Sequence, residues 1–419
     1  MRVSVFRVVP ASLVAVALIA GGCSSSKKSG STTGSAPTSS ANAATGTPIT
    51  VEMLGVPPSA GSSAADELSG FNVELRLIND SGGVKGHPIK VISCSNAGDA
   101  PTSTACARNA TGNQNVIAWI LGSSVGASVD PILDAGGLAS IGGSIYSPTD
   151  ATSKTSFTIS GGIFNTIDSA KAAVTQLGAK RIGVPYIDVP AGAQLAPFIN
   201  TVVKPLGGQA VGAIPIAATA ADITPQIAAE VAAKPDVIVD GLLIDQFTKL
   251  IRGAAQQGLN VPFLVSTGVF DAQTVTKNLG NISNTIYFVD EFDHQSPGYQ
   301  QFLSDMQKNN PSGSTDDSSL QGWMAIKLFA YAADHASSLT RQGILTEMNG
   351  LSNYDIDGLV PGLDYTSTNP GLGGSLPRIF NDSVWLEKFQ GGKAVPVGSY
   401  PQISMFRSTT SGSTTTTSG

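Results

Sequence analysis

A short serine motif, GSSVG at residues 122–126, is the part of the sequence whose residue types and spacing could support catalysis. It fits G-x-S-x-G, the pattern that places a nucleophilic serine between a strand and a helix in hydrolases. Ser124 would be the nucleophile, and it would need an acid and then a histidine later in the chain. Only His294 and His335 follow, and His335 lies within the apolar stretch AIKLFAYAADHAS. A serine hydrolase using Ser124 is therefore one alternative.

The same stretch also predicts a binding site. ILGSSVGAS passes from a buried strand to the start of a helix, which places the Ser123 hydroxyl and nearby N–H groups at a positive helix end. Such an end favours a carboxylate or another anion. Ser144 and Tyr146 follow the next strand, in GGSIYS, and should face the same cleft. The alternative for each hydroxyl is that it only caps a helix or a turn.

The N-terminal segment has the features of an export signal. Residues 1–22 combine two arginines with an apolar run and end in small residues, and AGGC resembles the lipobox of bacterial lipoproteins. We therefore expect Cys23 to be lipidated. Residues 23–46 form a Ser/Thr-rich tract suited to a flexible tether, and residues 408–419 form a similar tail that we expect to be disordered.

Two cysteines remain once Cys23 is assigned to the lipid. An exported protein folds in an oxidising setting, so we expect Cys94 and Cys106 to form a disulfide. Neither lies at ligand spacing from a histidine, and His87, His294 and His335 are scattered along the chain. The sequence therefore predicts no metal site.

The glycine-rich stretch INDSGGVKGHPIKV could suggest a phosphate-binding loop. It leads from a helical pattern into a strand, however, and Lys85 lacks the glycine spacing and the Ser/Thr partner of a Walker motif. Gly82 or Gly83 can adopt the left-handed conformation that ends a helix. We therefore interpret this stretch as a helix end, at the edge of the sheet opposite to the one where ligands bind.

The elements that must position these residues alternate between strand and helix patterns. The strand-like runs are TVEMLGV, IKVIS, VIAWILG, LASIGGS, RIGVPYI, AVGAIPI, DVIVDG, PFLVST and TIYFVDEF. Their apolar, β-branched character without strict alternation predicts parallel strands covered on both faces. Helical spacing between them, together with 419 residues, predicts an α/β protein with two lobes.

The composition excludes one broad class of function. The chain has a formal net charge of -6 and no basic face, so we do not expect it to bind nucleic acid. No pattern predicts a cofactor.

A family resemblance rests on Ile78, Asn79, Gly82, Gly83 and Gly86, in a helix that ends IN..GG..G before a strand. This pattern resembles type I periplasmic binding proteins, especially the leucine/isoleucine/valine-binding family of ABC importers. The resemblance continues through LIRGAAQQGL and SLQGWMAIKLFAYAADHA and covers roughly residues 47–404. It implies two doubly wound parallel-sheet lobes joined by three crossovers, which close on a small molecule.

The resemblance also implies lobe boundaries. The N-terminal lobe would take residues 47–159 plus 292–351, and the C-terminal lobe residues 160–291 plus 352–407.

Ligand residues can be transferred from the resemblance position by position. Ser123 and Ser124 stand where the family places serines at its ligand. In the second lobe Leu243 replaces a common aromatic residue, and Thr267 replaces the acidic residue that pairs with the ligand ammonium. Tyr186 and Asp188 lie close to the position of the family's tyrosine-bearing loop. Because of Thr267, we do not expect simple aliphatic amino acids to be the best ligands, unless Asp188 or Asp240 supplies the negative charge from another strand end.

Together these patterns predict an extracytoplasmic, lipid-anchored and monomeric binding protein, not an enzyme. It would capture an amino acid, carboxylate or amide and deliver it to the permease of an ABC importer. A membrane-tethered ligand sensor with the same fold is the other alternative. The ligand itself cannot be deduced from the sequence.

Overall fold

The computed structural model describes residues 43–55, 62–95, 99–122, 126–188, 192–267, 272–280, 285–369 and 374–406. The predicted signal peptide, Cys23, nearly all of the tether and the C-terminal tail lie outside these residues. Ser123 and Ser124 also lie outside them.

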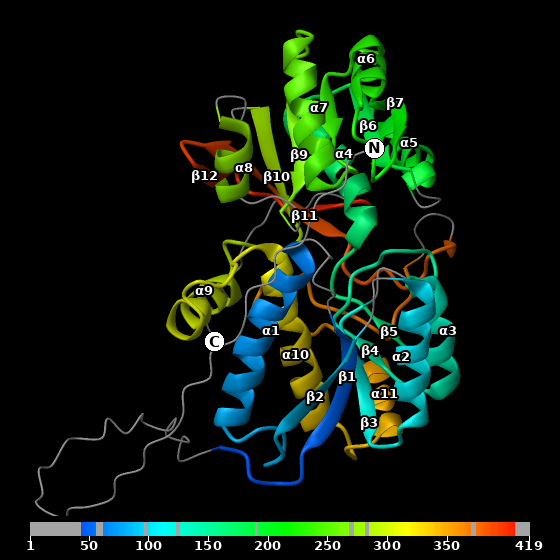
Figure 1. The fold of residues 1–419 in the computed structure, drawn as a ribbon, viewed down its shortest axis with the longest axis vertical. Helices are drawn as coiled ribbons and strands as arrows, with labels where there is room; N and C mark the ends of the chain where they lie inside the picture. The colour runs from blue at the N-terminus through cyan, green and yellow to red at the C-terminus, as the bar shows by residue number, and fades with distance from the viewer. Residues whose placement is uncertain are drawn as a thin grey trace, which may run out of the picture. The chain divides into compact units, whose positions relative to one another are not determined.

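Apolar, β-branched runs form the first sheet where the sequence predicted strands, apart from its short last strand, Ser156–Phe157, which was not predicted (Figure 1). Its strands are β1 (Ile49–Gly55), β2 (Ile89–Ser95), β3 (Val116–Ile120), β4 (Ser140–Ile141) and β5 (Ser156–Phe157). They are parallel and lie in the order β2-β1-β3-β4-β5. β3 is buried along its whole length, as expected for a strand covered on both faces.

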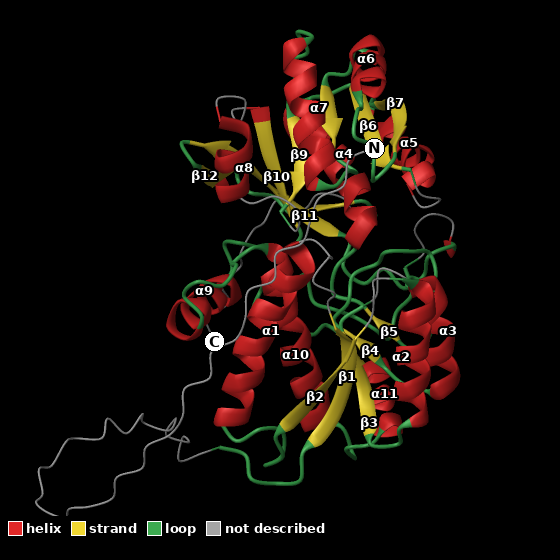
Figure 2. Cartoon of the chain, in the orientation of Figure 1, coloured by secondary structure: helices red, strands yellow, loops and turns green. Residues whose placement is uncertain are grey.

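Helices cover the two faces of this sheet (Figure 2). One face packs against α1 (Ser62–Asp80), α10 (Asp317–His335) and α11 (Arg341–Gly350), with α9 (Pro297–Asn309) beside α1. The other face packs against α2 (Ala100–Gly112) and α3 (Gly126–Gly136). The first core therefore combines residues from the start of the chain with residues beyond 290.

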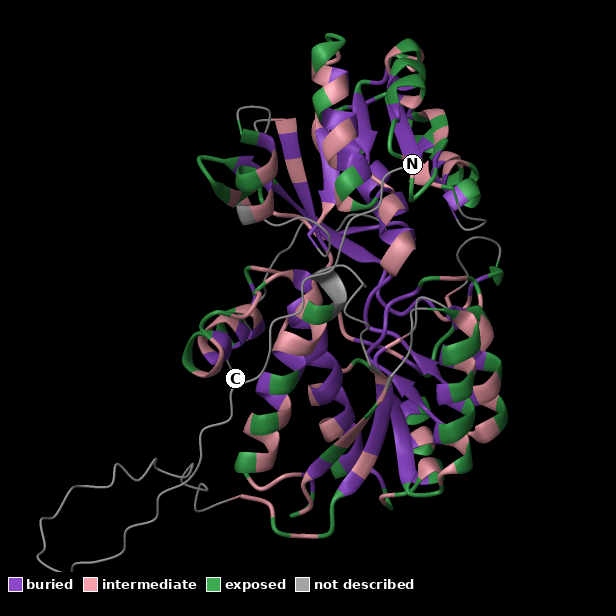
Figure 3. Ribbon diagram, in the orientation of Figure 1, coloured by how far each residue is buried: buried purple, intermediate pink, exposed green. Residues whose placement is uncertain are grey.

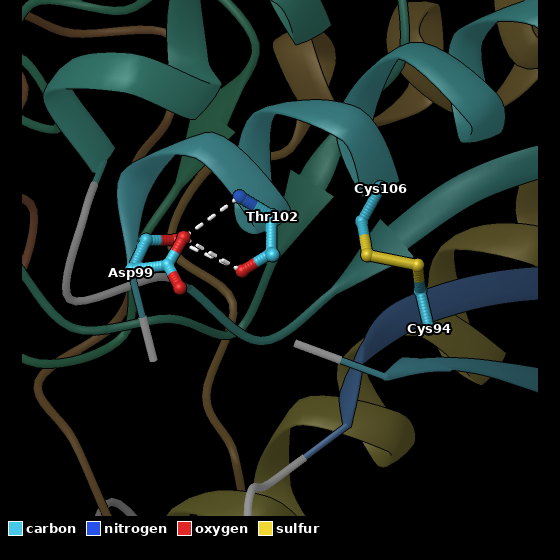
Figure 4. Close-up of a disulfide and its surroundings, with 4 residues drawn as sticks. All are labelled: Cys94, Asp99, Thr102 and Cys106. Carbon is cyan, nitrogen blue, oxygen red and sulfur yellow. Dashed lines mark hydrogen bonds between the residues drawn. A yellow bond between two sulfur atoms is a disulfide. The ribbon is translucent and has the colours of Figure 1, made fainter. Parts of the chain in front are cut away.

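The disulfide predicted from the cysteine count is present. Cys94 of β2 is bonded to Cys106 of α2, with their Cα atoms 5.8 Å apart (Figure 4). The same helix begins at Asp99, whose carboxylate Oδ1 accepts hydrogen bonds from the Thr102 N–H at 2.8 Å and the Thr102 hydroxyl at 2.9 Å. The cap stabilises the start of α2, and the disulfide joins the helix to the edge strand β2.

The second sheet contains the remaining predicted strands and several that the sequence pattern missed. Its strands are β6 (Arg181–Ile187), β7 (Gln209–Ile216), β8 (Val237–Val239), β9 (Phe263–Ser266), β10 (Ile286–Asp290), β11 (Ser383–Gln390), β12 (Lys393–Pro396) and β13 (Ile403–Ser404). The strands β10-β9-β8-β6-β7 are parallel, whereas β11 runs antiparallel to β10, β12 and β13. Polar residues such as Glu387 interrupt the apolar pattern of β11, so it does not read as a buried strand.

Helices cover both faces of this sheet too, and its strands are largely buried (Figure 3). The helices on one face are α4 (Asn165–Leu177) and α5 (Leu195–Val203), and those on the other face are α6 (Thr224–Ala233), α7 (Ile244–Gln256) and α8 (Ala272–Leu279). The α/β class is confirmed, and the predicted strands form two parallel sheets, the second of which is extended by the antiparallel strands β11, β12 and β13.

The glycine-rich stretch ends α1, as predicted. The Gly83 N–H donates to the carbonyl of Ile78 at 2.9 Å, and Gly83 has a φ of 63°. This is the left-handed conformation that closes a helix end and that other residues resist.

Three segments of the chain pass between the two sheets, and Asn381, in the third segment, forms hydrogen bonds with the other two. Its amide Nδ2 donates to the carbonyl of Ile159 at 3.0 Å and to the carbonyl of Glu291 at 3.5 Å. Residues 351–365 and Phe380 belong to the first core. We therefore propose that the last passage to the second lobe lies at Asn381, whereas the sequence pattern placed it at residue 352.

Candidate functional site

The predicted ligand residues lie just beyond the carboxyl ends of strands. Ser144 follows β4, Asp188 follows β6, Leu243 lies beyond β8, and Thr267 follows β9. Open α/β sheets bind ligands at this edge. Contacts among these residues and their neighbours show which of them the fold brings together.

Ser144 is turned into the protein. It is 5% exposed, and its hydroxyl donates to Gln321 Oε1 of α10 at 2.9 Å, while Gln321 Nε2 donates to the carbonyl of Gly142 at 3.1 Å. The hydroxyl hydrogen of Ser144 is therefore already used in joining β4 to α10. A ligand contact of Ser144 would therefore use the hydroxyl oxygen as an acceptor. This contact stays a prediction.

Tyr146 has the exposure that a ligand-binding side chain needs. It is 38% exposed, and its backbone N–H donates to Asp150 Oδ2 at 2.9 Å, which holds the loop in place. The carboxylates of Glu67 and Glu291 both lie within electrostatic reach of its phenol. Tyr146 therefore lies at an acidic surface, a property that the sequence pattern did not reveal.

The other predicted ligand residues of the second lobe each have different surroundings. Asp188 is exposed, and Leu243 exposes 51% of its surface immediately before α7. Tyr186 is partly buried and contacts Gly192 with its ring. Asp240 accepts the Leu242 N–H at 3.0 Å, and burial raises its pKa. The predicted roles of these residues in ligand binding remain predictions.

Thr267 connects the second sheet to α10. It is 6% exposed, and its hydroxyl donates to Asp317 Oδ2. The same carboxylate oxygen accepts the Glu291 N–H at 3.0 Å. Thr267 is thus joined to Asp317, an acidic residue fifty positions later in the chain.

Glu291 is the carboxylate that the sequence pattern missed. It directly follows β10 and is partly exposed. Its Oε2 accepts the hydroxyl of Ser160 from the first passage between sheets, and its Oε1 accepts the hydroxyl of Ser266 at 3.0 Å. Burial raises the pKa of Glu291, and the hydrogen bond from Ser160 opposes this effect.

Glu67 adds a further carboxyl group near the N-terminal end of α1. Burial raises its pKa to about 8, so a neutral carboxylic acid is the main form at pH 7. A nearby cation would favour the charged form and lower this pKa. Glu67, Glu291 and Tyr146 are collectively called the acidic cluster below.

His294 lies beside this cluster and contacts several carboxylates. Its Nε2 is 2.6 Å from Asp317 Oδ1, and its Nδ1 is 3.7 Å from Asp290 Oδ1 and 3.6 Å from Glu387 Oε2. Its ring stacks on Tyr299, with the ring centroids 4.2 Å apart. Burial lowers the pKa of His294, but the charges of Asp290 and Asp317 outweigh that effect and raise it well above its ordinary value.

A cavity elsewhere in the first lobe does not include any of these residues. It has a volume of about 440 Å³ and lies at the amino ends of β1 and β3, where Thr47, His87, Lys90 and Asn115 contribute to its lining. The acidic cluster lies at the carboxyl ends of the strands, which is where this architecture binds ligands. We therefore take the acidic cluster as the candidate site.

Comparison with known families identifies the protein at the family level. Residues 57–370 match the model of the periplasmic binding protein family. The chain belongs to the periplasmic binding protein family. Members of this family are substrate-binding proteins, so the protein is not an enzyme and the hydrolase alternative is rejected.

Solved structures agree with this fold. A leucine-binding protein from Thermotoga maritima MSB8 is 16% identical, with a TM-score of 0.68 over 85% of this chain and 99% of that one. A branched-chain amino acid transporter substrate-binding protein from Streptococcus pneumoniae, solved with isoleucine, is 16% identical, with a TM-score of 0.67 over 83% of this chain and 98% of that one. A fatty acid ABC transporter substrate-binding protein from Thermomonospora curvata is 17% identical, with a TM-score of 0.70 over 85% and 93%.

Comparison with curated proteins gives no match. Within the part of the chain that the structure describes, no helix is both long and apolar enough to cross a membrane.

Proposed function

We propose that this periplasmic binding protein captures a small amine-bearing molecule, an amino acid included, and delivers it to an ABC importer. The observation that supports this most directly is Glu291, whose carboxylate accepts hydrogen bonds from Ser160 and Ser266. These two hydroxyls orient a partly exposed carboxylate within the acidic cluster. A ligand ammonium placed there would pair with a positioned negative charge.

The charge of the surroundings favours a cation over an anion at this point. Glu67, Glu291 and Asp317 all lie around Thr267 and Tyr146. An anion buried here would be repelled by every carboxylate that is ionised, whereas an ammonium would favour the ionised forms of Glu67 and Glu291, whose pKa values burial raises. The absence of a carboxylate at Thr267 is therefore not a reason to expect poor binding of amines.

The opposite end of such a ligand could carry a carboxylate. α3 begins at Gly126, directly after the stretch that contains Ser123 and Ser124. A helix of this length has a positive N-terminal end that favours anions. A zwitterionic amino acid, as in the isoleucine complex of the Streptococcus protein, would satisfy both ends. The fatty acid protein provides the competing class, a carboxylate without an amine.

Three compounds of similar shape separate these classes: leucine, 4-methylpentanoate, which lacks the amine, and 3-methylbutylamine, which lacks the carboxylate. We expect leucine to stabilise the protein in thermal-shift and calorimetric titrations, by about 2.7 kcal/mol at a hundred times its dissociation constant. Glu291→Gln should weaken leucine binding at least about tenfold, because the ammonium would lose its charged partner.

Asp334→Asn is the matched control, because Asp334 is an exposed carboxylate on α10 and is not among the predicted ligand residues. It should leave leucine affinity unchanged. Stabilisation by 4-methylpentanoate but not by leucine or 3-methylbutylamine would contradict the proposal. Loss of leucine binding in Asp188→Asn but not in Glu291→Gln would place the ammonium elsewhere.

We also propose that the protein is tethered to the membrane through lipidated Cys23. The support is the charged start, the apolar run and the AGGC ending of the first residues. In cells, Cys23→Ala should move the protein from the membrane fraction to the soluble or secreted fraction, with Cys94→Ala/Cys106→Ala as a control that keeps the anchor. Unchanged membrane retention of Cys23→Ala would rule out this anchor.

A further inference from the structure

Three side chains beneath the acidic cluster have the arrangement of metal ligands. Asp290 ends β10, His294 follows it in the passage between lobes, and Glu387 lies on the neighbouring strand β11. One ligand atom from each lies within 4.8 Å of the other two. Asp290 and Glu387 are buried, and only 11% of the His294 side chain is exposed.

The contacts among these atoms are too long for hydrogen bonds. His294 Nδ1 is 3.7 Å from Asp290 Oδ1 and 3.6 Å from Glu387 Oε2. Ligand atoms of a tetrahedral Zn²⁺ site, with metal–ligand bonds of about 2.0–2.2 Å, are separated by roughly 3.3–3.6 Å. The observed spacing therefore leaves room for one ion between the three atoms.

The second polar atoms of His294 and Asp290 are engaged with other groups, which leaves Nδ1 and Oδ1 directed at the candidate ion. His294 Nε2 lies 2.6 Å from Asp317 Oδ1, and a carboxylate only accepts, so Nε2 carries a hydrogen and Nδ1 is the ring atom at which a metal ion would take the place of a proton. Tyr400 donates its hydroxyl to Asp290 Oδ2 at 2.9 Å. Asp290 Oδ1 has no hydrogen-bond partner among the described residues, although Asp290 is fully buried.

A carboxylate that accepts the second N–H of a metal-bound histidine is a common feature of zinc sites. Asp317 has this relation to His294. The charged groups around His294 favour a bound cation. Asp290, Asp317 and Glu387 face one imidazole, and a buried excess of negative charge is unfavourable unless it is neutralised. A divalent ion would neutralise two of these carboxylates.

We propose that Asp290, His294 and Glu387 bind one Zn²⁺ ion, with Asp317 as the residue that positions His294. The ion would join β10, β11 and the passage between lobes. Asp317 also accepts hydrogen bonds from Thr267 and from the Glu291 N–H, so the metal site lies next to the groups that position the acidic cluster. The site is separate from the proposed ligand site and does not depend on it.

Zinc binding can be measured directly on the full-length purified protein after treatment with EDTA and dialysis. Titration with ZnCl₂ near pH 7.5, followed by calorimetry and elemental analysis, should give one tightly bound ion per chain. Zn²⁺ should also raise the melting temperature without any organic ligand. Co²⁺ in the wild-type protein should give the visible absorption of a four-coordinate site with nitrogen and oxygen ligands.

Variants identify the ligands. Glu387→Gln and His294→Asn should weaken Zn²⁺ binding more than a hundredfold, and Asp317→Asn should weaken it about 10- to 100-fold through the orientation of His294. His335→Asn is the matched control, because His335 lies in an exposed position at the end of α10. It should leave Zn²⁺ affinity unchanged. Circular dichroism in EDTA shows whether each variant is folded.

The competing explanation is an imidazolium ion paired with the three carboxylates. It would give no stoichiometric Zn²⁺, no Co²⁺ absorption band and an NMR spectrum in which His294 remains doubly protonated in the presence of ZnCl₂. That combination in the wild-type protein would overturn the proposal whether or not the variants fold. Equal zinc loss in His335→Asn would place the ion at another site.

Discussion

Glu230→Gln is expected to raise the free energy of unfolding at alkaline pH by about 5 kcal/mol relative to the effect of the same substitution below pH 4.5. Glu230 lies on α6, is fully buried, and both of its carboxyl oxygens lack a hydrogen-bond partner among the described residues. Burial raises its pKa from 4.5 to about 8. The carboxyl is therefore protonated in the folded protein at neutral pH.

The direction of the pH effect follows from proton binding. Between about pH 4.5 and 8, the folded protein keeps a proton on Glu230 that the unfolded chain releases. The free energy of unfolding therefore falls as pH rises through this window, by up to about 1.4 kcal/mol per pH unit. Glutamine has no proton to lose, so the variant lacks this contribution.

Urea unfolding of both proteins at about pH 5, 7 and 9 measures the effect. The difference between the two unfolding free energies should increase with pH. Asp334→Asn, which removes an exposed carboxylate on α10, controls for the loss of one negative charge. A difference that stays constant from pH 5 to 9 would mean that the Glu230 carboxyl is hydrated or paired.

Gly322→Ala is expected to lower the free energy of unfolding by about 3 kcal/mol, because α1 and α10 are in backbone contact at this residue. A Cβ at Gly322 would lie 1.9 Å from the Glu67 carbonyl oxygen. The reverse contact is equally close, since a Cβ at Gly70 would lie 1.9 Å from the Ser319 carbonyl oxygen. The two helices would have to separate, which would also move Glu67 and Asp317.

Gly112→Ala provides the control for the change itself. Gly112 is exposed at the end of α2, and a Cβ there would have no atom within 4 Å. That variant should be neutral or more stable by about 0.5 kcal/mol, because alanine favours the helix. Equal unfolding free energies for Gly322→Ala and the wild-type protein would show that α1 and α10 can shift apart at little cost.

The sequence alone was sufficient to predict the α/β class, the parallel strands of both sheets except the short β5, and the end of α1. Each of these depends on a residue and its near neighbours: apolar runs such as VIAWI form strands, and a glycine such as Gly83 ends a helix. The disulfide could be predicted as well, because an exported chain with two remaining cysteines has one possible pair.

β11 shows where the local pattern failed. Glu387 and Lys388 interrupt its apolar run, so the strand is not recognisable from periodicity. Glu387 is buried because its carboxylate faces His294, a contact between different elements. The predicted lack of a metal site rested on the spacing of histidines and cysteines. Asp290, four residues before His294, was the signal that could have drawn attention to this region.

The acidic cluster was decided by the tertiary structure alone. Glu67 comes from α1, Tyr146 from the loop after β4 and Glu291 from the end of β10, far apart in sequence. Thr267 showed that the expected acidic residue was missing, but not that Asp317 would hydrogen-bond to it. Sequence patterns report on local burial and local conformation. The order of strands and the return of the chain into the first lobe determine which distant carboxyl groups share a site, and hence its charge.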